Sequence, residues 1–214
     1  MSDVVFGVLG LVLLCPAFAR LARGGPDAAM AFAQLVIFAL ALLFASVSTA
    51  EVVGVMGALG VVVPLALLWA LHPNRRSLLL RRGGWGAGGS RWMLGCALVL
   101  VVPAWAAAAV NAAHGRDDLP PRDSFAFVPS HWSVVTAMLL ASGVIALLAA
   151  TQRTNHRSIS ALSVAVAVLL FGVASIINPE VPSSGGRVWG VAAIAWTVVW
   201  FLTARLVAGA RKPV

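Results

Sequence analysis

The 214-residue sequence contains few charged residues and no tyrosine. Asp, Glu, Lys and Arg make up only 10% of it, whereas soluble domains contain about 25%. Hydrophobic residues make up 61%, so too few polar side chains are available to cover a soluble core. The composition excludes an ordinary globular domain and favours a helical bundle embedded in lipid.

Motifs of catalysis and metal binding are also missing. The sequence has no HExxH, no GxSxG and no phosphate-binding glycine loop. Cys15 and Cys96 lie inside apolar runs without CxxC spacing, so we interpret them as small core thiols. The four histidines are scattered, at His72, His114, His131 and His156. The sequence therefore predicts no catalytic residue, no metal site and no cofactor, although a haem- or quinone-binding enzyme stays open as a third possibility.

Seven apolar stretches are long enough to cross a bilayer, for which about 20 residues are needed. They cover residues 3–19, 28–48, 52–71, 92–113, 131–151, 159–178 and 188–208. Asp3 precedes the first stretch and Arg20 and Arg23 follow it, the reverse of a signal peptide, so we expect this helix to be retained. The sequence predicts an all-α polytopic membrane protein, one domain over residues 1–214 with about seven transmembrane helices.

Basic residues indicate the orientation. Seven spans place twelve of the fifteen on one face: Arg20, Arg23, Arg75, Arg76, Arg81, Arg82, Arg91, Arg153, Arg157, Arg205, Arg211 and Lys212. The opposite face has only Arg116, Arg122 and Arg187, together with six of the seven acids. Because Lys and Arg concentrate in cytoplasmic loops, we predict a multi-pass protein of the cell membrane with its N-terminus outside and its C-terminus in the cytoplasm.

The loop over residues 72–90 contains two arginine pairs, Arg75 with Arg76 and Arg81 with Arg82. Such pairs attract anionic lipid headgroups, or they could contact an acidic partner subunit. The net charge of +8 is thus explained by topology, and we predict no binding to nucleic acid. The short turn "TQRTNHRS", which joins the fifth and sixth spans, belongs to the same basic face.

Polar residues in or beside the spans are the candidates for a functional path or for helix packing. They are Gln34, Glu51, Asn111, His131 and Ser163. Glu51 lies at the tip of the hairpin between the second and third spans, and no Asp, Glu, Lys or Arg lies near the middle of any span. Since a proton-coupled carrier ordinarily needs a buried ionisable group, we predict no obligatory protonation site in the interior. For Gln34 we favour the role of a hydrogen-bond donor between helices.

Small residues and prolines also predict packing. Gly54, Gly57 and Gly60 recur at every third position, and we expect them to form one stripe suited to close helix contact. Pro64 and Pro103 can kink the third and fourth spans.

Four stretches resemble the subunit-E family of hydrogenase-4 and formate-hydrogenlyase complexes, whose last three helices are related to the small K subunit of respiratory complex I. They are "AFAQLVIFALALLFAS", "GVVVPLALLWALHPN", "ASGVIALLAATQRTNHRSISALSVAVAVLLFG" and "NPEVPSSGGRVWGVAAIAWTVVWFLTARL". The third has the apolar helix, short basic turn and apolar helix typical of that family, and the fourth resembles the family's last helix. The resemblance implies seven spans and a place among larger membrane subunits.

The sequence departs from the family at the family's charged positions. Where members have a Glu after the basic turn, this chain has Ser163 and Val164, and where they have a Lys before the proline of the third span, it has Leu59 and Gly60. The resemblance therefore implies a non-catalytic subunit of a complex-I-like hydrogenase assembly without a proton half-channel. The alternative is a stand-alone seven-helix protein that transports a small solute or handles lipid.

Overall fold

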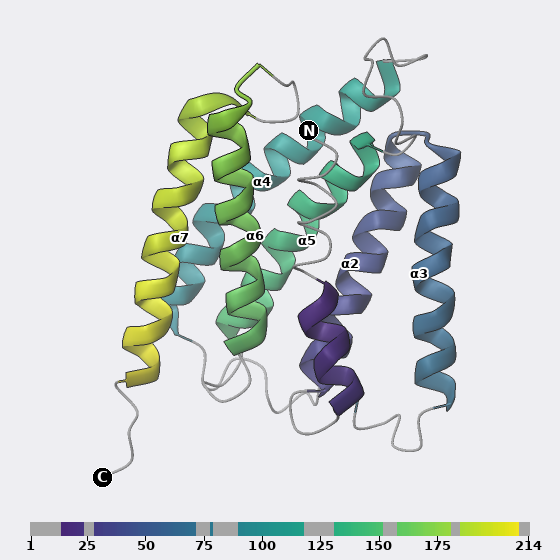
Figure 1. The fold of residues 1–214 in the computed structure, drawn as a ribbon, viewed down its shortest axis with the longest axis horizontal. Coiled ribbons are helices and arrows are strands. Elements are labelled where there is room, and N and C mark those ends of the chain that lie inside the picture. Colours follow the sequence, from purple (N-terminus) through teal and green to yellow (C-terminus); the bar gives the residue numbers. More distant parts are fainter. Residues whose placement is uncertain are drawn as a thin grey trace.

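The computed structural model describes residues 14–23, 28–71, 78, 90–117, 131–151, 158–180 and 185–209. Its long elements there are all helices (Figure 1). They are α2 (Ala28–Ser48), α3 (Val52–Leu71), α4 (Arg91–Asp117), α5 (His131–Thr151), α6 (Ser158–Ile177) and α7 (Gly186–Gly209). A shorter helical segment covers residues 14–23. The predicted fold class, an all-α polytopic membrane protein, is confirmed.

Each of the six long helices is long and apolar enough to cross a membrane. The predicted bounds are correct for α2, α3 and α5 and within two residues for α6 and α7. Helix α4 continues to Asp117, four residues beyond the predicted end. The predicted first span, 3–19, lies outside the described residues except for 14–19, where the helix continues to residue 23.

Successive long helices run in opposite directions, so their ends meet at two faces of the bundle (Figure 1). One face, which we call the basic end, has the first residues of α4 and the last turns of α7, with Arg91 and Arg205. The opposite face, the acidic end, has the α2–α3 turn with Glu51 and the end of α6 with Glu180. This arrangement agrees with the predicted alternation of loops, while the assignment of the basic end to the cytoplasm stays a prediction.

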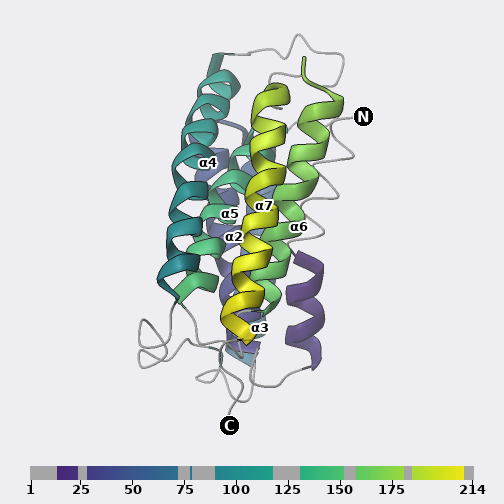
Figure 2. The same cartoon turned by 90° about the vertical axis from the view of Figure 1, so that its left-hand side faces the viewer.

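Helix α5 lies at the centre of the bundle and α3 at its edge (Figures 1 and 2). In α5, 67% of the apolar span is buried, against 17% in α3. The core around α5 consists largely of alanine, with Val135, Met138 and Ile145 among the larger side chains. Because lipid tails are as apolar as leucine, the exposed Leu, Val and Phe side chains of α3, α4 and α7 suit contact with the bilayer.

Two glycines bring α6 and α7 into close contact. A Cβ atom added to Gly172 would lie 2.8 Å from the carbonyl oxygen of Gly190, and one added to Gly190 would lie 2.7 Å from that of Gly172. No side chain fits at either position without moving a backbone. Glycine at both positions therefore sets how closely the two helices approach, as in other membrane helix pairs with small residues at their crossing.

The predicted glycine stripe of α3 packs only at its first member. A Cβ at Gly54 would meet the hydroxyls of Ser46 and Ser133 at 2.6 and 2.7 Å. A Cβ at Gly57 or Gly60 would meet no atom within 4 Å. The expectation of one packed stripe is wrong because three residues turn a helix about 60° short of a full turn. Gly60 thus lies about 120° around α3 from Gly54, on a face that the bundle leaves open.

Candidate functional site

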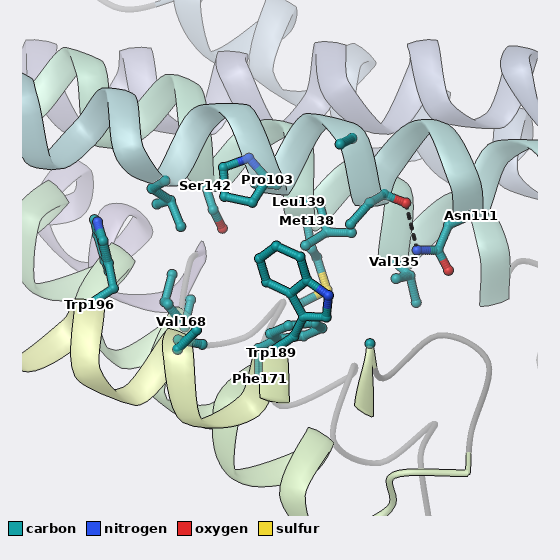
Figure 3. A pocket seen from close by; sticks show the side chains of 18 of the residues that line it. Pro103, Asn111, Val135, Met138, Leu139, Ser142, Val168, Phe171, Trp189 and Trp196 are labelled. Atoms are coloured by element: carbon teal, nitrogen blue, oxygen red, sulfur yellow. Dashed lines mark hydrogen bonds between the residues drawn. The ribbon is translucent and has the colours of Figure 1, made fainter. Parts of the chain in front are cut away.

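A cavity of about 470 Å³ lies between four helices, mainly in the half of the bundle near the acidic end (Figure 3). Its walls are formed by residues from four segments: 99–111 of α4, 135–142 of α5, 167–171 of α6, and 185–196 beside and within α7. Cavities of about 300–1,000 Å³ are typical of small-molecule sites.

The cavity forms because α4 and α5 are inclined to α6 and α7 (Figures 1 and 2). Near the basic end, α7 is tied to α4, since the Trp196 indole N–H donates to the carbonyl of Cys96 at 2.7 Å. The Cys96 thiol also lies 3.8 Å from the Thr203 hydroxyl. Toward the acidic end the two helices diverge, and the space between them becomes the cavity.

A proline lies in the part of α4 that forms the cavity wall. Pro103 has no N–H group, so the carbonyl of Val99 loses its usual helical donor. Both residues line the cavity. A proline at this position favours a bend of α4, and the kink at Pro103 stays a prediction.

The mouth of the cavity opens on the outer surface of α4 and α7. Three lining residues are also strongly exposed: Val99 at 66%, Val110 at 55% and Trp189 at 54%. These side chains belong to the apolar outer surface of membrane-spanning helices. A molecule dissolved in the bilayer could therefore enter sideways between α4 and α7.

The walls of the cavity are almost entirely apolar. None of the described lining residues is charged, and the polar ones are Asn111, Ser142 and the indoles of Trp189 and Trp196. The Asn111 amide nitrogen donates to the carbonyl of Ala107 at 2.8 Å (Figure 3). Its Oδ1 is buried without a hydrogen-bond partner. An apolar chamber with one unsatisfied amide oxygen suits a hydrophobic molecule that carries a single polar group.

The structure separates the polar residues that the sequence singled out. Of the five, Asn111 lines the cavity, and Gln34 and Ser163 do not. Gln34 is fully buried, and its Oε1 accepts a hydrogen bond from the Ser160 hydroxyl at 3.0 Å, which links α2 to α6. The hydrogen bond between helices expected for Gln34 is present, but in it the Gln34 side chain accepts, whereas a donor was expected. Ser163, one turn further along α6, is also buried, and its hydroxyl has no hydrogen-bond partner.

Glu51 lies where the sequence placed it, in the turn between α2 and α3. Its backbone N–H donates to the carbonyl of Ser46 at 3.0 Å, and the preceding Ala50 has a φ of 56°. Glu51 directly precedes the first turn of α3, where a carboxylate favours the helix dipole. A structural role at a helix start thus accounts for this acid.

Several predicted contacts fall on residues that the structure does not describe. His131 begins α5, and its side chain lies outside the described residues. The four arginines of the 72–90 loop, Arg75, Arg76, Arg81 and Arg82, lie outside them too, as does most of the basic turn "TQRTNHRS". Their assignment to lipid or partner contact stays a prediction.

Sequence reasoning missed the cavity itself. Pro103 was identified only as a possible kink, and Ser142 was not singled out. Each lining residue is an ordinary component of a membrane helix, and the cavity results from the angle between helix pairs, which periodicity does not give. Among the described residues, no group of three or more His, Cys, Asp or Glu could hold a metal ion.

Comparisons of this chain with protein-family models, with curated proteins and with solved structures found no match.

Proposed function

We propose that this chain is a lipid-handling membrane protein that takes an apolar molecule from the bilayer into the cavity between α4, α5, α6 and α7. The observation that carries the proposal is the cavity itself, with apolar walls and a mouth at the membrane-facing surface of α4 and α7. Apolar cavities stay dry and bind hydrocarbons. The same walls disfavour an ion or a polar solute, because a charged group loses its hydration there without gaining a partner.

Binding can be measured with a brominated long-chain alkane, because bromine quenches tryptophan fluorescence and Trp189 and Trp196 belong to the cavity wall. The test variant is Ala107→Phe, which places a phenyl ring in the cavity. Ala109→Phe is the matched control, since Ala109 is on the same helix, is exposed and does not line the cavity.

We expect saturable quenching in the unmodified protein and in Ala109→Phe, and no saturable quenching in Ala107→Phe. Equal quenching in all three proteins, rising only with the amount of probe in the membrane, would show that the probe meets the outer surface of the helices and does not occupy the cavity.

A second proposal is narrower and rests on the sequence resemblance: the chain is a non-catalytic subunit that packs against antiporter-like subunits of a complex-I-like hydrogenase assembly. Helix α3 supports a place for such a partner, because it is mostly exposed and has open space at Gly57 and Gly60. Flat faces of this kind allow another membrane helix to approach closely.

Affinity purification from native membranes tests this second proposal. Antiporter-like subunits should co-purify with the tagged chain, and Gly57→Leu with Gly60→Leu should release them. Gly95→Leu on α4 is the control, because Gly95 also has no atom within 4 Å. Recovery of the chain in a form that is stable in detergent and has no such subunit bound would contradict the proposal.

A further inference from the structure

The geometry points to an uncharged lipid alcohol as the occupant of the cavity, with its hydroxyl group donating a hydrogen bond to Asn111 and its chain extending toward Trp196. This inference rests on the proposed function and narrows it to a class of ligand. Three features of the described residues support it: the unsatisfied oxygen of Asn111, the lack of charge in the walls, and the position of Asn111 along α4.

A hydrogen bond within α4 identifies which atom of the Asn111 amide is the oxygen. Its nitrogen donates to the carbonyl of Ala107 at 2.8 Å, and the reverse assignment would place two acceptors against each other. The remaining atom, Oδ1, is therefore an acceptor. It is buried, has no hydrogen-bond partner, and belongs to a side chain that is only 5% exposed.

Buried acceptors without a donor are rare in native proteins, and each calls for an explanation. Asn111 lines the cavity, and the terminal torsion of an asparagine is broad, so a small swing of the amide turns its oxygen toward the cavity. In Figure 3 this oxygen points away from α4. A ligand hydroxyl supplies the missing donor, whereas a ketone, ester or ether oxygen does not.

The walls exclude a charged headgroup. None of the described lining residues is basic. The nearby Arg116 is directed elsewhere, because its Nε donates to the carbonyl of Ser48 at the end of α2. Arg187 is exposed at the start of α7 and does not line the cavity. A carboxylate or phosphate would thus be buried without a partner, at a large cost in binding.

The position of Asn111 along α4 gives the orientation of the ligand. Asn111 lies six residues before Asp117, where α4 ends at the acidic end, so the hydroxyl would sit near the membrane surface. From Asn111 to Val99 the cavity follows α4 for twelve residues, or about 18 Å at the helical rise. The apolar remainder of this length, as far as Trp196, accommodates the alkyl chain.

Four brominated probes with the same long chain test the inference in the purified full-length protein. They end in a methyl group, a hydroxyl, a methyl ether and a carboxylate. Affinity is measured by quenching of tryptophan fluorescence, with the Ala107→Phe protein as background. We expect the alcohol to bind about five-fold more tightly than the alkane, the effect of one ordinary hydrogen bond. The ether and the carboxylate should show no such gain.

The Asn111→Leu variant should lose the preference for the alcohol over the alkane. An ether that binds as tightly as the alcohol, or a carboxylate that does so through Arg187, would overturn the inference while the alkane result still supports a lipid-binding cavity. Because the four probes are compared first in the unmodified protein, the inference can fail even where Asn111→Leu does not fold. If Ala107→Phe leaves the quenching by all four probes unchanged, the cavity is refuted as a binding site altogether.

Discussion

Replacing Gly190 with alanine is expected to separate α6 from α7 and to lower the stability of the bundle. The added Cβ would lie 2.7 Å from the carbonyl oxygen of Gly172 and 3.1 Å from the backbone nitrogen of Ile176. Ordinary contact begins near 3.4 Å, so the carbonyl must retreat by about 0.7 Å. Since this atom belongs to a helix backbone, it retreats only if the whole of α6 shifts.

The expected cost follows from overpacking, which destabilises a well-packed core by about 1–3 kcal/mol. Alanine also favours the helix over glycine by up to about 1 kcal/mol, which partly offsets the clash. Gly95→Ala isolates this second effect, because Gly95 is in the second turn of α4 and a Cβ added there would meet no atom within 4 Å. We expect Gly95→Ala to leave the free energy of unfolding unchanged or to raise it slightly. We expect Gly190→Ala to lower it by about 1–2 kcal/mol.

The measurement is reversible unfolding in mixed micelles, followed by tryptophan fluorescence, for Gly190→Ala, Gly172→Ala, the double variant and Gly95→Ala. Both glycine changes separate α6 from α7 at the same crossing. The double variant should therefore lose clearly less free energy of unfolding than the sum of the two single losses. A Gly190→Ala protein as stable as Gly95→Ala, or fully additive single effects, would show that α6 and α7 do not meet at these two residues.

Two further predictions concern the packing and the orientation of the helices. Ser160→Ala removes the donor to Gln34 and should lower the free energy of unfolding by about 0.6 kcal/mol, the average for hydrogen bonds between membrane helices. In the same assay, Thr151→Ala should have a smaller effect, because the half-buried Thr151 hydroxyl bonds its own helix at Leu148. Reporter fusions at positions 85 and 118 should report opposite sides of the membrane, with position 85 in the cytoplasm, and the same side for both would show that the number of spans between them is wrong.

The sequence was sufficient to locate the helices because length and apolarity decide which segments cross a bilayer. Where the apolar run and the helix end together, as in α2, α3 and α5, the predicted bounds were correct. Helix α4 continues through His114 to Asp117 because helical hydrogen bonds, once started, do not depend on apolar side chains. Apolarity reports where the hydrocarbon core ends, and the helix can extend past it.

The site was only partly predictable. Asn111 and Gln34 were recognisable as polar residues in apolar runs, but the sequence could not distinguish them. The structure does so, because Gln34 meets a hydroxyl of another helix and Asn111 lines a cavity. Which residues of a helix face a neighbour depends on the angles between helices. For the same reason Gly54 packs while Gly57 and Gly60 do not.

The bond from Arg116 to the end of α2 has a consequence for how the chain enters the membrane. In the predicted orientation, the translocation machinery must carry this arginine to the outer side, against the usual retention of positive charge in the cytoplasm. The hairpin of α2 and α3 is synthesised earlier, and at its tip the carbonyl of Ser48 and the negative end of the α2 dipole are available as acceptors. Arrival of Arg116 there would make the insertion of α4 hard to reverse. The α2–α3 hairpin would thus stabilise α4 in its inserted position.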